Sequence, residues 1–159
     1  MKIEPQTQHQ WLQQMLGDWT YEGEAAMGSG QPRAKFKGTE RVRPLGDLWV
    51  VAESQGDTPG GSTASMIMTL GYDPQAKRYT GTWVGSMMTH LWIYDGEMDA
   101  AGRVLTLNAE GPSMSGNGKM AKYQDIIEVK SDDHRILRAR VQGDDGTWNE
   151  FMTSHYRRT

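Results

Sequence analysis

Hydrophobic and polar residues alternate along most of the chain, and turn residues interrupt the alternation about every ten positions. From residue 18 onward this period of two is typical of strands with one buried face. A glycine-rich loop is expected at 28–32. We predict ten strands, at residues 19–27, 35–43, 48–55, 65–72, 78–86, 89–94, 104–109, 121–130, 136–142 and 148–157.

One segment, residues 7–16, has a helical pattern instead. Thr7 is a suitable N-cap, and Gly17 ends the segment. Its apolar residues share one face of the predicted helix: Trp11, Leu12, Met15 and Leu16. We expect this helix to cover one end of the sheet structure that follows.

The connections between the predicted strands are short, which favours antiparallel pairing between neighbours in sequence. An open sheet of this size would expose both edges and one apolar face, and closure into an up-and-down barrel removes the edges. The predicted fold class is therefore all-β: a single antiparallel barrel of about ten strands, capped by the short helix, in one domain over residues 1–159. A barrel of this size has room for a small ligand.

The amino-acid composition argues against membrane-spanning and nucleic-acid-binding proteins. Hydrophobic residues make up 36% and charged residues 23%, which is too polar for a membrane span. The net charge is −3 and the basic residues are scattered, which argues against nucleic acid as a partner. Cysteine is absent, and the first eight residues lack the apolar core of a signal peptide, so we predict a cytoplasmic protein.

No catalytic or metal-binding motif is present in the sequence. Gly118-Lys119 lacks the first glycine and the following Ser or Thr of a phosphate-binding loop, and no serine stands in a Gly-x-Ser-x-Gly setting. No metal site is predicted, because there is no cysteine and the histidines share no short spacing: His9, His90, His134 and His155.

Two carboxylates are candidates for the barrel interior. Glu40 falls on the apolar face of its strand, whereas the strand that carries Glu53 is apolar on both faces, so its orientation stays open. As an inward pair they could act as general acid and base. The favoured interpretation is structural, with pairing to Arg138 or Arg140, since a buried charge persists only when it is compensated.

Aromatic and methionine side chains are candidates for the wall of a pocket. Met66, Met87 and Met88 would supply adaptable apolar surface, and His90 or His155 could serve as the axial ligand of a haem. The sequence leaves open whether such residues line a cavity or fill a core. The candidate ligand-binding residues are Glu40, Glu53, Met68, Trp83, His90, Trp92, Tyr94 and Tyr123.

Several of these motifs resemble known families. Gly17-Asp18-Trp19 after a short helix resembles the Gly-x-Trp opening of lipocalins and related calycin barrels. That resemblance implies that a basic residue at the end of the last strand, Arg157 or Arg158, packs over Trp19; with Gly17 and Trp19, Arg157 completes the predicted closure of one barrel end.

A more specific resemblance extends over essentially the full chain. It rests on Leu16–Trp19, Leu70–Pro74, Lys77–Tyr79 with Trp83, Asp95-Gly96, Asp99–Leu107 and Tyr156-Arg157. These segments are similar to the bacterial family catalogued as domain of unknown function 1579. The chain has Gly46-Asp47 where that family usually shows two glycines. Membership implies a calycin-like barrel and supplies no established activity or catalytic residues.

Four functions are compatible with such a barrel. The first is non-enzymatic binding of a small apolar or amphipathic ligand in the interior, with no cofactor. The second is haem binding, as in the nitrobindins, which resemble this chain in strand count and Gly-x-Trp opening. The others are an enzyme that uses an inward carboxylate on a hydrophobic substrate, and an interaction or scaffold barrel. A homodimer through residues 89–94, which include Leu91 and Ile93, is a further prediction.

Overall fold

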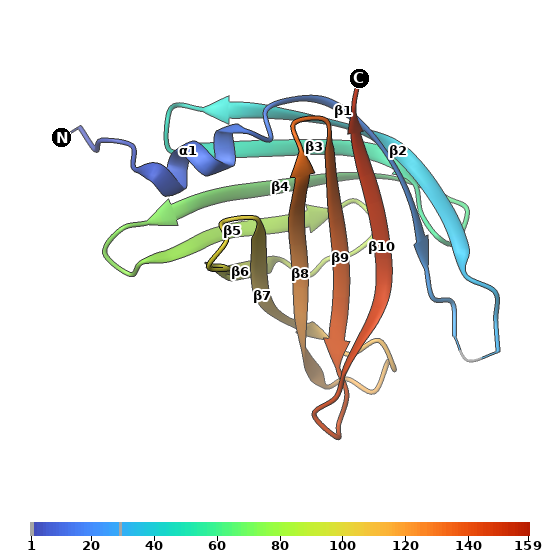
Figure 1. The fold of residues 1–159 in the computed structure, drawn as a ribbon. Helices are drawn as coiled ribbons and strands as arrows, with labels where there is room; N and C mark the ends of the chain where they lie inside the picture. Colours follow the sequence, from blue (N-terminus) through green and yellow to red (C-terminus); the bar gives the residue numbers. More distant parts are fainter. Residues whose placement is uncertain (1, 29) are drawn as a thin grey trace.

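The computed structural model describes residues 2–28 and 30–159, and this part of the chain forms ten strands and one helix (Figure 1). Met1, the first residue of the predicted domain, and Ser29, in the predicted loop at 28–32, lie outside the described residues. The elements are α1 (Thr7–Gln13), β1 (Gly17–Ala25), β2 (Ala34–Leu45), β3 (Trp49–Asp57), β4 (Thr63–Asp73), β5 (Arg78–Gly85), β6 (Trp92–Met98), β7 (Val104–Pro112), β8 (Met120–Ser131), β9 (His134–Gln142) and β10 (Trp148–Arg158).

The strands form one closed antiparallel barrel. Each strand pairs with its neighbours in sequence, and β1 also pairs with β10, which closes the wall. The predicted fold class, an all-β up-and-down barrel of ten strands with a short helix, is therefore confirmed. In Figure 1, β8, β9 and β10 cross in front of β3, β4 and β5 at a steep angle, so the view passes through two sides of the wall.

Every predicted element differs from the structure in at least one boundary, and the helix and the sixth strand are two examples. The helix ends at Gln13 rather than at residue 16, because the next amides bond three residues back, as in Met15 N–H to Leu12 O at 3.1 Å. The sixth strand spans Trp92–Met98 rather than 89–94, since residues 86–91 form the loop after β5. Leu91 and Ile93, of the predicted dimer surface, are 49% and 64% exposed.

The helix plugs one end of the barrel. Leu12 is 1% exposed and belongs to the same apolar cluster as Leu105 and Leu107, and α1 contacts β3 and β4. Two hydrogen bonds fix α1 to the end of β4 and to the turn after β6. The Trp11 indole N–H donates to Gly102 O at 2.7 Å, and His9 Nε2 donates to Tyr72 O at 3.0 Å. The core therefore lies beneath the helix.

Trp19 seals the same end between two guanidinium groups. Arg158 lies 4.2 Å from the centroid of the indole and Arg135 lies 4.7 Å from it. Gly17 has a φ of +122°, and a Cβ at this position would lie 2.6 Å from Arg158 Nη1, so glycine is required. Arg157 was the wrong choice of closing residue: it alternates to the outer face, whereas Arg158 pairs with Trp19 across β1 and β10.

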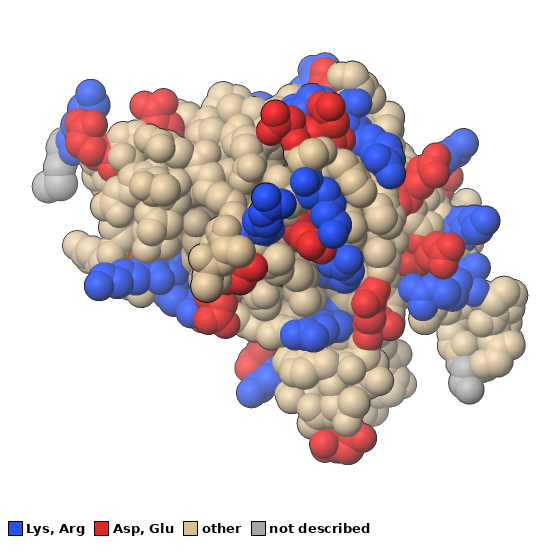
Figure 2. Space-filling view, viewed as in Figure 1, with Lys and Arg blue, Asp and Glu red and all other residues tan. Residues whose placement is uncertain are grey.

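The outer surface carries charges of both signs. Figure 2 shows Lys and Arg interspersed with Asp and Glu over the face in view, and exposed pairs such as Arg78 with Asp95, at 2.7 Å, join neighbouring strands. Within residues 2–28 and 30–159, no helix has the length and hydropathy that a membrane crossing requires. The same residues contain no group of three or more His, Asp or Glu side chains arranged to hold a metal ion.

Candidate functional site

The barrel encloses a cavity of about 590 Å³. Its lining includes residues of the loops after β3, β5 and β7, among them Pro59, Met88 and Met114, at the end opposite α1. Met88 and Met114 are also exposed to solvent, so the cavity opens between these loops. Seven methionines, which adapt readily to ligand shape, contribute to the wall: Met15, Met66, Met68, Met87, Met88, Met114 and Met152.

Aromatic side chains form one wall of the cavity. Trp83 and Trp92 are directly opposite each other on β5 and β6, and Trp92 packs edge-on against Tyr123 of β8 at 4.9 Å between ring centroids. Gly111 leaves the room that the Trp92 ring occupies, because a Cβ there would lie 2.1 Å from the ring. The Tyr123 hydroxyl donates to Pro112 O at 2.5 Å, which holds this ring in place.

Glu40 lies in the cavity wall as part of a buried ion pair. Its carboxylate accepts from the Arg135 guanidinium and from Ser54 Oγ, the latter at 2.9 Å. The guanidinium also lies 4.1 Å from the Tyr156 ring centroid. The ionic partner predicted for Glu40 was wrong. Arg138 and Arg140 alternate to the outer face of β9, where Arg138 pairs with Glu128.

Glu53 lies outside the barrel, contrary to its prediction as an inward carboxylate. Val50, Ala52 and Ser54 are the residues of β3 that line the cavity, so Glu53 has the opposite orientation. Its carboxylate accepts from Arg43 Nε at 3.0 Å on the exposed face. The acid and base pair with Glu40 is therefore excluded by the register of β3.

Asp125 is an inward carboxylate that the sequence analysis did not select. It lies on β8 between Tyr123 and Ile127 on the cavity face, and its Oδ2 accepts a hydrogen bond from the Tyr94 hydroxyl of β6. Burial raises the pKa of Asp125 to about 6, although the hydrogen bond from Tyr94 acts in the opposite direction. Burial, and then Asp125 itself, raises the pKa of Tyr94 well above its usual value.

His90 lies at the mouth of the cavity with one ring nitrogen engaged. Its Nε2 contacts Glu110 O at 2.9 Å and must donate, since a carbonyl oxygen only accepts. The ring packs edge-on against Trp92 at 4.7 Å. An axial haem ligand needs a free nitrogen lone pair, so Nε2 does not fit that role in this arrangement.

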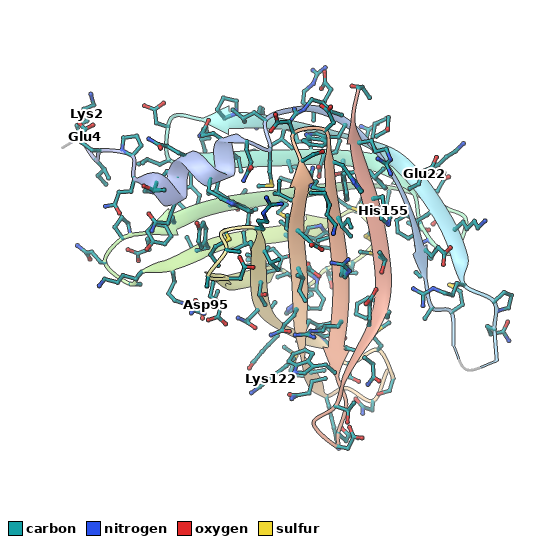
Figure 3. The ribbon with its side chains drawn as sticks, in the orientation of Figure 1. Lys2, Glu4, Glu22, Asp95, Lys122 and His155 are labelled. Carbon is teal, nitrogen blue, oxygen red and sulfur yellow. The ribbon has the colours of Figure 1, made fainter. Side chains whose placement is uncertain are left out.

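His155 lies on the outer face of the barrel. It stacks on His134 of β9, with 3.0 Å between His134 Nε2 and His155 Nδ1, and it is opposite Glu22 of β1 (Figure 3). The stacked pair is remote from the interior, because inward and outward residues alternate along β10. His155 therefore does not contribute to a haem site in the cavity.

The family of the chain follows from comparison with family models. The model described as protein of unknown function (DUF1579) matches residues 4–158. The chain belongs to this family. The resemblance carried by the segments at 70–83 and 95–107 is thus confirmed, and the DUF1579 family supplies no activity from which to assign the cavity. None of the curated proteins matches the sequence of this DUF1579 chain.

Solved structures with similar folds come from several proteins. Rv2717c from M. tuberculosis has a TM-score of 0.66 and 12% identity, with 98% of this DUF1579 chain and 99% of that chain covered. The S-type phycobiliprotein lyase CPES from Guillardia theta has a TM-score of 0.61, 12% identity and 98% coverage of both chains. EF1p2_mFAP2b bound to DFHBI has a TM-score of 0.52 and 14% identity, with 96% and 100% covered. At these identities the likeness shows the fold alone.

Seven of the eight candidate residues lie in the cavity wall of this DUF1579 barrel, all except Glu53. The residues that the sequence analysis missed are the polar partners inside: Ser54, Arg135, Asp125 and Tyr156. Asp125 had a usable signal, because the alternation that turns Tyr123 inward also turns Asp125 inward. Arg135 shares the inward face of β9 with Leu137 and Ala139, but it lies just before the predicted strand at 136–142, and its pairing with Glu40 joins strands that are far apart in the sequence.

Proposed function

We propose that this barrel binds a small apolar or amphipathic molecule in its interior and does not act as an enzyme. The observation that carries the proposal is the cavity of about 590 Å³, whose walls are mainly methionine, aromatic and aliphatic side chains. Ligand pockets range from roughly 300 to 1,000 Å³ and combine apolar walls with a few polar groups. The Glu40–Arg135 pair and Asp125 are the polar groups of this wall.

A similar barrel that holds a ligand supports the proposal. EF1p2_mFAP2b has DFHBI bound, and its structure covers 96% of this chain. That protein differs from this one at most positions, as its 14% identity shows, so the support concerns the fold and not the ligand. A protein of similar fold is thus known with a bound compound, and a barrel of this strand number has interior room for a small ligand.

The side chains of the interior favour binding over catalysis. Glu40 is committed to Arg135, and Glu53 lies outside. In the described part of the chain no serine or threonine hydroxyl is hydrogen-bonded to a histidine, as an activated nucleophile requires. An enzyme would have to rely on Asp125 as its inward carboxylate, which is the alternative that this interior leaves.

A neutral fluorescent probe, 1-aminoanthracene, tests the proposal. We expect saturable binding to one site with enhanced fluorescence. Ala139 is buried in the cavity wall directly opposite Asp125, so Ala139→Phe fills the space and should weaken binding by about ten-fold or more. Lys122→Phe adds the same side chain at an exposed position of β8, labelled in Figure 3, and should leave binding unchanged. Equal affinity in both variants, with both folded by circular dichroism, would exclude the cavity as the site.

Haem binding through His90 is the second function that can be tested. Nε2 donates to Glu110 O, so axial ligation would have to use the lone pair of Nδ1. We expect no such ligation, and hemin should therefore give the same absorption spectrum with the protein and with His90→Gln. Optical titration with hemin near the Soret band measures this. A red-shifted Soret band that disappears in His90→Gln would establish axial ligation and replace the proposal above.

The proposal extends to the cellular location of the protein and to its oligomeric assembly. A chain without cysteine suits a reducing compartment, so we infer a cytoplasmic protein. Exposed Leu91 and Ile93, together with Ile67 and Val84 of the neighbouring strands, offer an apolar surface for a homodimer. The dimer stays a prediction.

A further inference from the structure

The cavity wall contains more acidic than basic side chains. Three carboxylates line it, Glu40, Asp57 and Asp125, against one guanidinium, that of Arg135. Glu40 and Arg135 neutralise each other. Asp125 in the interior and Asp57 at the end of β3 therefore leave the described lining with an excess of negative charge.

We propose that the cavity selects ligands that carry a cationic group, such as an ammonium or a guanidinium, and that the Asp125 carboxylate is the counter-ion. The inference rests on the proposed function and names the ligand class of the same site. The apolar part of the ligand would lie against the methionine and aromatic walls, and the cationic group would lie beside β8.

The Asp125 carboxylate makes a hydrogen bond inside the cavity wall but forms no ion pair with a described residue. Oδ2 accepts from the Tyr94 hydroxyl, and no lysine or arginine in the described residues forms an ion pair with either oxygen. A carboxylate within an apolar wall has lost much of its hydration, which raises its pKa to about 6. A bound cation would replace that hydration and stabilise the ionised form.

Aromatic rings in the wall near this carboxylate favour the same kind of ligand. Tyr123 precedes Asp125 on the inward face of β8, Tyr94 is hydrogen-bonded to it, and Trp92 packs against Tyr123. The face of an aromatic ring attracts a cation, with indole the strongest, and aromatic cages are a known mode of binding quaternary ammonium groups. A carboxylate beside these rings adds a full negative charge.

The same wall disfavours anionic ligands such as fatty acids. Arg135 is the cation that could receive a ligand carboxylate, but its side chain is 6% exposed and is bound to Glu40. A ligand carboxylate in the cavity would therefore lie near Asp125, and the described lining offers it no cation whose charge is not already paired. Like charges at short range in a low-dielectric interior repel strongly.

Selectivity for cations should depend on pH. The groups packed around Asp125 are Tyr94 from β6, Leu107 from β7, Ala139 from β9 and Tyr156 from β10, and the last contacts the Glu40–Arg135 pair. Burial holds the pKa of both tyrosines well above its usual value, so they stay neutral. As pH falls through about 6, Asp125 takes up a proton and the affinity for a cation should fall.

Three ligands with ten-carbon chains, the carboxylate carbon of decanoate included, separate the contributions of tail and head: decyltrimethylammonium, decanol and decanoate. Each is titrated calorimetrically into the purified protein at about pH 7.5. We expect decyltrimethylammonium to bind at least about ten-fold more tightly than decanol, because contacts with a charged partner exceed neutral ones by this order. Decanoate should bind most weakly.

Four variants test whether the preference depends on Asp125. Asp125→Asn keeps the shape but removes the charge, so it should erase the preference for decyltrimethylammonium and leave decanol unchanged. Glu53→Gln removes an exposed carboxylate on the outer face and should change nothing. Tyr94→Phe removes the hydrogen bond that lowers the pKa of Asp125, so the pH at which cation affinity is half lost should rise. The pH series is repeated in His90→Gln, because His90 is a second titratable group at the mouth.

The outcomes separate this inference from the proposed function. If decanol and 1-aminoanthracene bind but head-group charge has no effect, or decanoate binds best, the cationic class is wrong while the binding function stands. Retention of the preference in Asp125→Asn would also overturn the role of Asp125. If neither the three ligands with ten-carbon chains nor 1-aminoanthracene binds, the proposed function fails and this inference fails with it.

Discussion

Replacement of Arg135 by methionine is expected to lower the free energy of unfolding by about 3 to 5 kcal/mol. The substitution leaves the Glu40 carboxylate buried, with Ser54 as its one remaining side-chain donor among the described residues. Methionine keeps much of the volume that packs between Trp19 and Tyr156, so the loss should come mainly from the uncompensated charge. Urea denaturation at about pH 7 measures it.

A double-mutant cycle separates the charge from the packing. Glu40→Leu alone should be destabilising because it strands the guanidinium, whereas Glu40→Leu with Arg135→Met should recover most of the loss, since neither charge is then buried. The exposed pair Arg43–Glu53 is the matched control, and Arg43→Met should cost no more than about 1 kcal/mol. Additive losses in the double variant would show that packing on the aromatic rings, and not ion pairing, explains the effect.

The strands and most of the cavity wall could be predicted because hydrophobic and polar residues alternate with a period of two along the chain. On β5, β6 and β8 the inward positions carry bulky aromatics and the outward positions mostly polar or β-branched residues, so Trp83, Trp92 and Tyr123 were placed correctly by alternation alone. Closure followed from the short connections, which leave each strand beside its neighbours in sequence.

The orientation of β3 could not be read in the same way. Val50 and Val51 are both buried, so the strand is apolar on both faces and the alternation gives two equal solutions. The choice is made by pairing with β2, which sets Glu53 opposite Arg41 on the outer face and Ser54 opposite Glu40 on the inner one. A one-residue difference in register exchanges the faces of a strand, which is why Glu53 was misplaced.

The partners of the buried charges depend on contacts across the barrel. Arg135 meets Glu40 because β1 and β10 lie between β9 and β2 in the closed wall. Alternation places Arg135 on the inward face with Leu137 and opposite to Arg138, but the predicted strand began at residue 136 and so did not include Arg135. Whether the interior is hollow likewise depends on the combined volume of all inward side chains. Small residues such as Ala52 and Ala139 leave space only because the opposite walls do not fill it.

Asp125 should make the stability of the barrel fall as pH rises. Its pKa is about 6 in the folded protein, against 3.8 as the ordinary value, so the folded state holds a proton that the unfolded state has lost between these values. The contribution is therefore fully present below about pH 4 and is lost as pH rises through about 6. A shift of about two units corresponds to roughly 3 kcal/mol.

Asp125→Asn isolates this contribution from every other titrating group. The difference in the free energy of unfolding between the variant and the parent should be near zero at about pH 4, and the variant should be more stable by up to about 3 kcal/mol at about pH 8. Urea denaturation of both proteins across this range provides the comparison, and other carboxylates cancel in the difference. A difference that does not change with pH would contradict a buried, desolvated carboxylate at this position.

The same pair of proteins links stability to the proposed ligand. A cation that pairs with Asp125 binds the folded state, so decyltrimethylammonium below its micelle concentration should raise the unfolding midpoint of the parent at about pH 8 and do so much less at about pH 5. Asp125→Asn should show a smaller rise that is independent of pH, because only the apolar tail contributes. The desolvation of the ionised Asp125 carboxylate destabilises the folded protein, and a bound cation would offset that loss. This free energy would then be the source of the selectivity for cationic ligands.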